Sequence, residues 1–271
     1  MVRWGRVAGP WAALLGVAGC GGGLPLLHPA HVEPEGQVTG AVGVSGQFLV
    51  GDASRALQQA RENSSEGSAV AGTTSDAYRR GALAVAALAP GVAPWVGARV
   101  GLGRSSEAGL GYSGRSLRVD GRYALQNGAV ALSLGLGGQA LLARRQEDGR
   151  EGLRGVDLGG ISGYGFDVPV VAGWRSEAGL LSAWVGLRGG HERQRGKIAF
   201  DPDGTGQQVL DWSATRWWGG GLVGLMAGFR RVFVALELGA ARHDAGASAG
   251  GTRIDLKGVT LTPSGALLGR F

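Results

Sequence analysis

The chain has 271 residues, of which 54 are Gly and one is Cys, and its formal net charge is +6. One Cys excludes an internal disulfide framework and any metal site built from several cysteines. After the N-terminal stretch, no segment reaches the roughly 18 uninterrupted apolar residues of a transmembrane helix, which argues against a helical membrane protein. The small basic excess forms no stripe among aromatic residues, so we expect no nucleic-acid partner.

The first twenty residues have the pattern of an export signal. Arg3 and Arg6 form a positive region, and residues 7–19 form an apolar core too short to span a membrane. The core ends in Val17-Ala18-Gly19-Cys20, which resembles the lipobox of bacterial lipoproteins. The resemblance implies that residues 1–19 are a signal peptide cleaved before Cys20. It also implies a diacylglycerol on the Cys20 thiol and a further acyl chain, such as palmitate, on the new amine.

The residues around the expected lipid anchor suggest where it is delivered. Gly21 stands where lipoproteins kept at the inner membrane commonly have Asp, so the resemblance implies sorting to the outer membrane of a Gram-negative cell. Residues 20–37 are rich in Gly and Pro and show no periodicity. We therefore predict a flexible, lipid-anchored tether that leads to a single domain over residues 38–271.

Residues 116–142 carry the clearest pattern in that domain. Leu117, Val119, Tyr123 and Leu125 alternate with polar or small residues, and a second arm alternates in the same way after Asn127-Gly128. A period of two gives a strand one apolar and one polar face, and Asn-Gly favours a two-residue hairpin turn. Arms of about ten residues match tilted membrane-spanning strands, so we predict one hairpin of a membrane β-barrel.

The same alternation recurs along the rest of the chain. It predicts strands at 38–50, 95–103, 156–173, 181–188, 217–229, 232–239 and 259–271. Between them, residues 51–93, 143–155, 190–212 and 243–255 have the composition of long loops. Residues 104–110 (Arg-Ser-Ser-Glu-Ala-Gly-Leu) are echoed by residues 175–180 (Arg-Ser-Glu-Ala-Gly-Leu), which indicates two tight turns on one rim.

Two features favour a membrane barrel over a soluble β-sandwich. Long and short connections mostly alternate, as do the external loops and periplasmic turns of bacterial barrels. The chain also ends on Phe271 in an alternating strand, which resembles the terminal aromatic signal of the barrel-assembly machinery, although Gly265 and Gly269 depart from that pattern. We predict an all-β, antiparallel up-and-down barrel of about ten strands, with eight or twelve as alternatives and both termini in the periplasm. For residues 82–89 the sequence leaves three alternatives open: a short helix, a plug element or a strand.

Nine charged residues fall on the side of the strands predicted to face inward: Arg99, Arg118, Asp120, Arg122, Asp167, Arg188, Arg216, Glu237 and Arg270. A barrel of this size is about filled by its own side chains, so we expect a closed lumen held by Arg–carboxylate pairs. In particular, Arg118, Arg122 and Arg188 are expected to pair with Asp120, Asp167 and Glu237. Because inward Arg outnumbers inward acid, a small anion-preferring channel is the alternative.

Catalytic signals are sparse. His191-Glu192 and His243-Asp244 are expected at strand–loop edges, which keeps a surface hydrolase at the rim as a further alternative, yet no nucleophile and base share a diagnostic spacing. No cofactor, metal site or catalytic residue is predicted. The sequence thus predicts an outer-membrane barrel lipoprotein with a structural or surface-interaction role. Its expected partners are outer-membrane lipid and the lipoprotein-processing and barrel-assembly machineries, and its external ligand and oligomeric state are left open.

Overall fold

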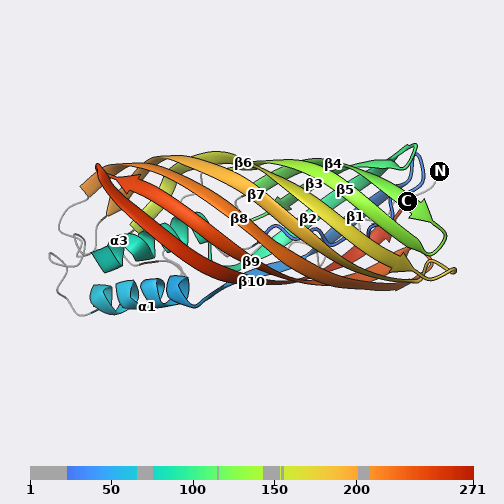
Figure 1. The fold of residues 1–271 in the computed structure, drawn as a ribbon, viewed down its shortest axis with the longest axis horizontal. Helices are drawn as coiled ribbons and strands as arrows, with labels where there is room; N and C mark the ends of the chain where they lie inside the picture. Colours follow the sequence, from blue (N-terminus) through green and yellow to red (C-terminus); the bar gives the residue numbers. More distant parts are fainter. Residues whose placement is uncertain (1–22, 66–75, 115, 143–152, 154–155, 201–207) are drawn as a thin grey trace, which may run out of the picture.

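A computed structural model describes residues 23–65, 76–114, 116–142, 153, 156–200 and 208–271. Over these residues the fold is a closed ring of ten strands in which each strand pairs antiparallel with its chain neighbours and β10 returns to β1 (Figure 1). The prediction of a ten-stranded, antiparallel up-and-down barrel is therefore confirmed. In the part of the chain that is described, no helix is long and apolar enough to cross a membrane.

The strands fall into a short set and a long set. The short strands, of 8 to 13 residues, are β1 (Val38–Val50), β2 (Gly91–Gly103), β3 (Ser106–Ser113), β4 (Ser116–Asn127) and β5 (Val130–Leu141). The long strands, of 18 to 22 residues, are β6 (Val156–Arg175), β7 (Leu181–Phe200), β8 (Gln208–Phe229), β9 (Val232–Ala249) and β10 (Thr252–Arg270). One side of the barrel wall is therefore much taller than the other.

The two ends of the barrel differ. The turns at residues 104–105, 128–129, 176–180 and 230–231 and the C-terminus lie at one end, which we call the turn end, on the right in Figure 1. The tight turns between β3 and β4 and between β9 and β10 lie at the opposite end, together with the longer connections. At the turn end the Phe271 amide donates to the Val38 carbonyl at 2.8 Å, so the last strand closes on the first. Asn127 pairs with Val130, which makes Gly128-Ala129 the hairpin turn, one residue beyond the predicted dipeptide. Gly128 has a φ of +57°, the left-handed conformation that such a turn requires.

The predicted loop at 51–93 contains helices at the opposite end of the barrel. They are α1 (Asp52–Ser65), α3 (Asp76–Leu83) and the π-helical turn η2 (Ala84–Leu88), and we call them together the helical cap. Residues 82–89 are thus mainly helical, and β2, β3 and β4 are separate strands. Close packing needs small residues: a Cβ on Gly81 would lie 2.2 Å from that of Ala60, and one on Gly258 would lie 2.6 Å from that of Ala53.

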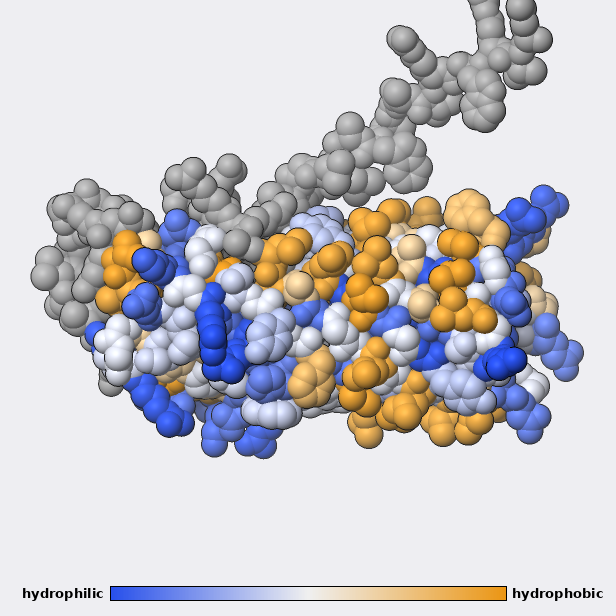
Figure 2. Space-filling model, turned by 90° about the horizontal axis from the view of Figure 1, so that it is seen from above, coloured by the Kyte–Doolittle hydropathy of each residue, from blue (hydrophilic) through white to orange (hydrophobic). Residues whose placement is uncertain are grey.

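Exposed apolar side chains of all ten strands form a belt near the turn end, and Figure 2 shows part of it as orange patches on the right of one face. This apolar belt consists of exposed aliphatic side chains that alternate with inward residues: Val42, Val44, Val96, Leu110, Val119, Leu132, Leu134, Val168, Val170, Val185, Leu187, Val223, Leu225, Val234, Leu236, Leu261 and Leu267. Exposed aromatic residues flank it, with Tyr164, Phe166 and Trp217 on one side and Tyr123, Trp174 and Phe229 on the other. An apolar band between aromatic girdles is the lipid-facing pattern of a transmembrane barrel.

Two segments predicted as loops are strands instead. Residues 190–200 and 208–212 belong to β7 and β8, and residues 243–249 and 252–255 belong to β9 and β10. The period of two continues through them, but its polarity inverts. On β10, Arg253, Asp255 and Lys257 face outward while Ile254 and Leu256 are buried, whereas Val259 and Leu261 are exposed farther along the same strand. The predicted loop at 143–155 lies almost wholly outside the described residues.

The inward face of these strand extensions packs on the helical cap. Ile198, Trp212 and Ile254 belong to a buried apolar cluster that also contains Leu83 and Leu88 of the cap. Two inward amides hold the end of the cap, because Gln47 donates to the Leu88 carbonyl and Gln194 donates to the Ala86 carbonyl. The cap therefore belongs to the core of the extended half and closes that end of the barrel.

Candidate functional site

Residues 20–37 were predicted to be a flexible tether, but the described part of this stretch is an ordered segment inside the barrel. Residues 23–35 lie largely in the lumen, and Leu26, Leu27, His28 and His31 are each at most 4% exposed. We call this segment the luminal plug. Its backbone groups meet charged side chains of the wall, which supply the hydrogen bonds that an irregular segment cannot make with itself. A sequence without periodicity cannot distinguish such a plug from a tether, because neither forms a regular strand or helix.

Glu237 on β9 binds the plug through backbone amides. Its carboxylate accepts hydrogen bonds from the Leu26 amide at 2.8 Å, the Leu27 amide at 3.0 Å and the Trp184 indole at 3.1 Å. The prediction that Glu237 pairs with an arginine is therefore wrong. A carboxylate with three donors is satisfied without a cation, so this buried acid is committed to the plug.

Arg122 on β4 is the second anchor of the plug. Its guanidinium donates to the Pro29 carbonyl at 2.5 Å, to His28 Nδ1 at 2.7 Å and to the His31 carbonyl at 3.0 Å. It also forms an ion pair with Glu107 at 3.0 Å. The planar guanidinium has several donors in fixed directions, which suits it to several acceptors of one bent segment.

The remaining luminal charges form a chain of alternating sign across the wall. The order is Arg122, Glu107, Arg99, Asp120, Arg118, Asp167 and Arg188, and each member forms an ion pair with the next. The shared Asp167 lies 2.9 Å from Arg118 and 2.8 Å from Arg188. At the far end, Arg188 donates to the Leu24 carbonyl of the plug. The chain of charges thus contacts the plug at both of its ends.

The structure places all nine predicted charged residues inside the barrel. Two of them lie outside the alternating chain, since Arg216 pairs with Glu192 at 2.6 Å and Arg270 pairs with Glu33 of the plug at 3.0 Å. Sequence reasoning missed three carboxylates: Glu33, Glu107 and Glu192. With them, inward carboxylates equal the six predicted inward arginines in number, and five of the six form ion pairs with those arginines. The excess of inward arginine that favoured an anion channel therefore disappears.

A usable signal existed for two of the missed acids. Glu107 was expected in a turn, but it lies on β3 and is 1% exposed. It is two residues before Gly109 and therefore on the same, inward face of the strand. Glu192 lies four residues after Arg188 on β7 and therefore on the same face. Extending the period of two through both segments finds them. Glu33 precedes the first strand, so no periodicity marks it.

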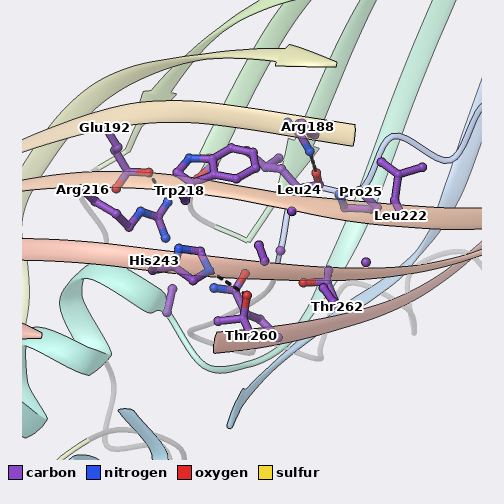
Figure 3. Close-up of a pocket in the computed structure, with 18 of the residues that line it drawn as sticks. Leu24, Pro25, Arg188, Glu192, Arg216, Trp218, Leu222, His243, Thr260 and Thr262 are labelled. Atoms are coloured by element: carbon purple, nitrogen blue, oxygen red, sulfur yellow. Dashed lines mark hydrogen bonds and ion pairs between the residues drawn. The ribbon is translucent and has the colours of Figure 1, made fainter. Parts of the chain in front are cut away.

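A polar cavity of about 110 Å³ lies between the plug and the helical cap. Figure 3 shows Arg216, Trp218 and His243 directed into it from β8 and β9, with Leu24 and Pro25 of the plug among its other lining residues. His243 Nε2 is 2.8 Å from Thr260 Oγ1, while His243 Nδ1 and Trp218 Nε1 have no partner among the described protein atoms. This volume suits a few water molecules, because ligand pockets usually measure about 300 Å³ or more.

The histidines do not form the rim site that the hydrolase alternative requires. His191 lies on the outer surface of β7, with its ring 4.4 Å from that of Trp217 and 5.9 Å from that of Phe166. His243 is buried inside the barrel, and among the described side chains its hydrogen-bond partner is Thr260, not a carboxylate. Among the described residues, no group of three His, Cys, Asp or Glu side chains could hold a metal ion. Cys20 lies outside the described residues.

Comparisons with known proteins give the following. No family model matches the sequence, and no curated protein matches it. Solved structures with a similar outline include the attachment invasion locus protein Ail of Yersinia pestis, with 12% identity, a TM-score of 0.30, and coverage of 88% of this chain and 99% of that one. Neisserial surface protein A has 10% identity and a TM-score of 0.30, covering 87% and 99%. The outer membrane protease OmpT of Escherichia coli has 9% identity and a TM-score of 0.35, covering 88% and 97%. Values this low say nothing about the activity of this chain.

Proposed function

We propose that this chain is an outer-membrane barrel that is closed to solutes and acts through the surface it holds outside the membrane. The observation that carries the proposal is the filling of the lumen from two directions. The luminal plug occupies the turn end, and the helical cap closes the opposite end. A structural or surface-interaction role fits a barrel of this kind, because external surfaces on a rigid scaffold commonly carry binding functions.

The membrane location is proposed from the apolar belt and its aromatic girdles. Bacterial barrels place their short turns in the periplasm and their longer connections outside. On that basis the turn end, with Phe271, faces the periplasm, and the helical cap with the extensions of β6–β10 faces the exterior. The terminal Phe271 is proposed as a signal for barrel assembly, and its side chain is 78% exposed.

The lipid anchor at Cys20 is proposed from the lipobox resemblance. The described chain begins at Gly23, whose carbonyl accepts a hydrogen bond from Ser113 at 2.8 Å inside the barrel. Three residues span about 10 Å at most, so an acylated Cys20 has to reach lipid within that distance while the plug is seated. Ser113 ends β3, the shortest strand, so the low wall there is the proposed route. Mass spectrometry of the mature N-terminus tests the anchor, and an unmodified N-terminal peptide would refute it.

Planar-bilayer recording of the full chain tests closure. We expect no steady conductance, because ion-paired side chains and the plug fill the lumen. Deletion of residues 23–32 should open a small conductance, whereas replacement of residues 52–89 by two glycines should not, because the plug and the charge network remain. A steady anion current in the unaltered protein that Arg122→Glu reverses would show that the lumen is a channel.

Orientation is tested by labelling whole cells with a membrane-impermeant maleimide. Ser248→Cys, on the outward face of the β9 extension, should react from outside. Glu177→Cys, in the exposed turn between β6 and β7, should react only after the outer membrane is broken. The reverse pattern would invert the proposed topology, and labelling of both on intact cells would argue against a membrane location.

A further inference from the structure

The outer surface of β6, β7 and β8 changes its chemistry in the same order on all three strands. Moving away from the turn end, aliphatic residues of the apolar belt are followed by an aromatic cluster of Phe166, His191 and Trp217. On β7 the next outward residues are Arg193, Arg195 and Lys197, all exposed. The cations therefore begin directly where the lipid-facing aromatic residues end.

Hydroxyl groups flank these cations on both neighbouring strands. Arg193 lies between Tyr164 of β6 and Thr215 of β8 in the register of the sheet. Arg195 lies in the same way between Ser162 and Ser213. All four neighbours face outward and are exposed. Two guanidinium groups surrounded by hydroxyl donors make a surface rich in donors for an anion, and we call these six residues the arginine–hydroxyl patch.

The patch lacks the acidic partners found elsewhere on the same surface. In the described part of the chain, Arg193 and Arg195 form no ion pair, and the nearest outward acid along the ladder, Asp211, lies opposite Lys197. On β9 and β10, by contrast, Lys257 lies 3.8 Å from Asp244, and Arg253 lies 3.4 Å from Asp255. The exposed cations Arg253 and Lys257 of β10 are thus compensated, whereas Arg193 and Arg195 of β7 are not.

We propose that the arginine–hydroxyl patch binds the phosphate groups of a phosphorylated glycolipid in the outer leaflet. Guanidinium groups bind phosphate through paired, charge-assisted hydrogen bonds, and the hydroxyls add neutral donors. The aromatic cluster fixes the source of the phosphate, because Phe166 and Trp217 contact the acyl and sugar region of a lipid whose headgroup lies at the arginines. The inference rests on the proposed membrane location of the barrel.

Lipid binding is measured by native mass spectrometry of the full chain in uncharged detergent, titrated with lipid A as the phosphorylated glycolipid. Arg193→Gln combined with Arg195→Gln should weaken binding about tenfold or more, since each basic residue near a membrane surface contributes about a factor of five. Arg253→Gln is the matched control, because that arginine is exposed on the same extension but already paired. The Arg253→Gln variant should bind lipid A as tightly as the unaltered protein does. Exchanging the detergent for another uncharged one should also leave the affinity for lipid A unchanged.

Two further ligands identify what is recognised. To the unaltered protein, dephosphorylated lipid A should bind about tenfold more weakly than lipid A. To the double variant, the two lipids should bind with equal affinity. Equal binding of both lipids to the unaltered protein, or an equal loss in Arg253→Gln, overturns the patch as a phosphate site. Inorganic phosphate that competes at the same concentration as lipid A overturns the lipid as its ligand. Heat-modifiable gel mobility and insertion into uncharged vesicles test the barrel separately, so a failure of the membrane location is distinguishable from a failure of this site.

Discussion

The two halves of β9 have opposite polarity although they share one backbone. Near the turn end, Val234 and Leu236 face outward and are exposed, while Glu237 faces the lumen. In the extension, Arg242 and Asp244 are exposed outward, while residues on the inner face, among them Ala245 and Ala247, are buried against the helical cap. The alternation is the same, so the surroundings decide which face is apolar.

Which face of a strand is apolar therefore depends on the solvent at its outer face and on the material that fills the barrel. In the proposed membrane location, the half of the barrel near the turn end, here the membrane half, has hydrocarbon as its outer solvent, and its filling is an irregular segment whose backbone requires polar partners. In the same proposal the half formed by the strand extensions, here the external half, has water as its outer solvent, and its filling is the helical cap, whose helices form most of their own backbone hydrogen bonds. The inner face of the wall is therefore charged where it packs on the luminal plug and apolar where it packs on the helical cap.

Removing a carboxylate from the ionic core of the membrane half should destabilise the protein most. Glu107→Leu leaves Arg99 without one of its two carboxylates and Arg122 without its carboxylate, and it removes the acceptor of the Glu33 amide. Loss of one partner from a buried ion pair typically costs about 3–5 kcal/mol. We expect a fall of that size in the free energy of unfolding, measured by urea titration in vesicles.

Glu177→Leu is the matched control for this change, because Glu177 occupies the same place in the repeated Arg-Ser-Glu-Ala-Gly-Leu pattern but is exposed in a turn. We expect a change within about 0.5 kcal/mol. Equal losses for both variants would mean that Glu107 contributes no more than a surface acid, and the network would lose its proposed role in holding the plug.

The repeated pattern also shows how far the sequence could predict the structure. Alternation identified the barrel, its membrane strands and the inward placement of residues such as Asp167 and Arg188. It failed where polarity inverts, as in residues 243–255, because polar outward and small inward residues resemble a loop when only apolar outward residues are expected. It also failed for the plug, since the contacts of Leu26 with Glu237 join residues 211 positions apart and leave no local pattern.

The apolar core of the external half gives the next effect. Leu88 is fully buried at the end of the helical cap, and Leu88→Ala should cost about 2–5 kcal/mol of cap stability through lost burial and the cavity that remains. Limited proteolysis within α1 should then become faster, while the membrane half stays protected. Gln58→Ala, on the exposed face of α1, should not change the rate. If the cap were cleaved equally fast in all forms, it would not be part of the folded core.

The free-energy cost of an outward arginine can be compared between the two halves on the same face of β9. Leu236→Arg places a guanidinium in hydrocarbon, which costs about 2–4 kcal/mol near the bilayer centre and less toward its edges. Ser248→Arg makes the same substitution on the same outward face of β9, in the extension, and should cost less than about 0.5 kcal/mol. Refolding titrations into vesicles measure both. Similar costs would show that the boundary between lipid and water does not lie between these two positions.

The smallest effect is a pH dependence confined to the external half. Tyr78 lies fully buried in the helical cap, and burial raises the pKa of its phenol from 10.0 to about 12. Because the folded state holds this proton more tightly than the unfolded state, the stabilisation is complete below pH 10 and is lost as the pH rises toward 12. Cap proteolysis should therefore accelerate between pH 10 and pH 12, measured with a protease whose activity is calibrated at each pH.

Tyr78→Phe keeps the ring without the ionisable group, so its cap should show a weaker acceleration over that range. An identical acceleration in both proteins would assign the effect to other groups and leave the burial of Tyr78 without a measurable consequence.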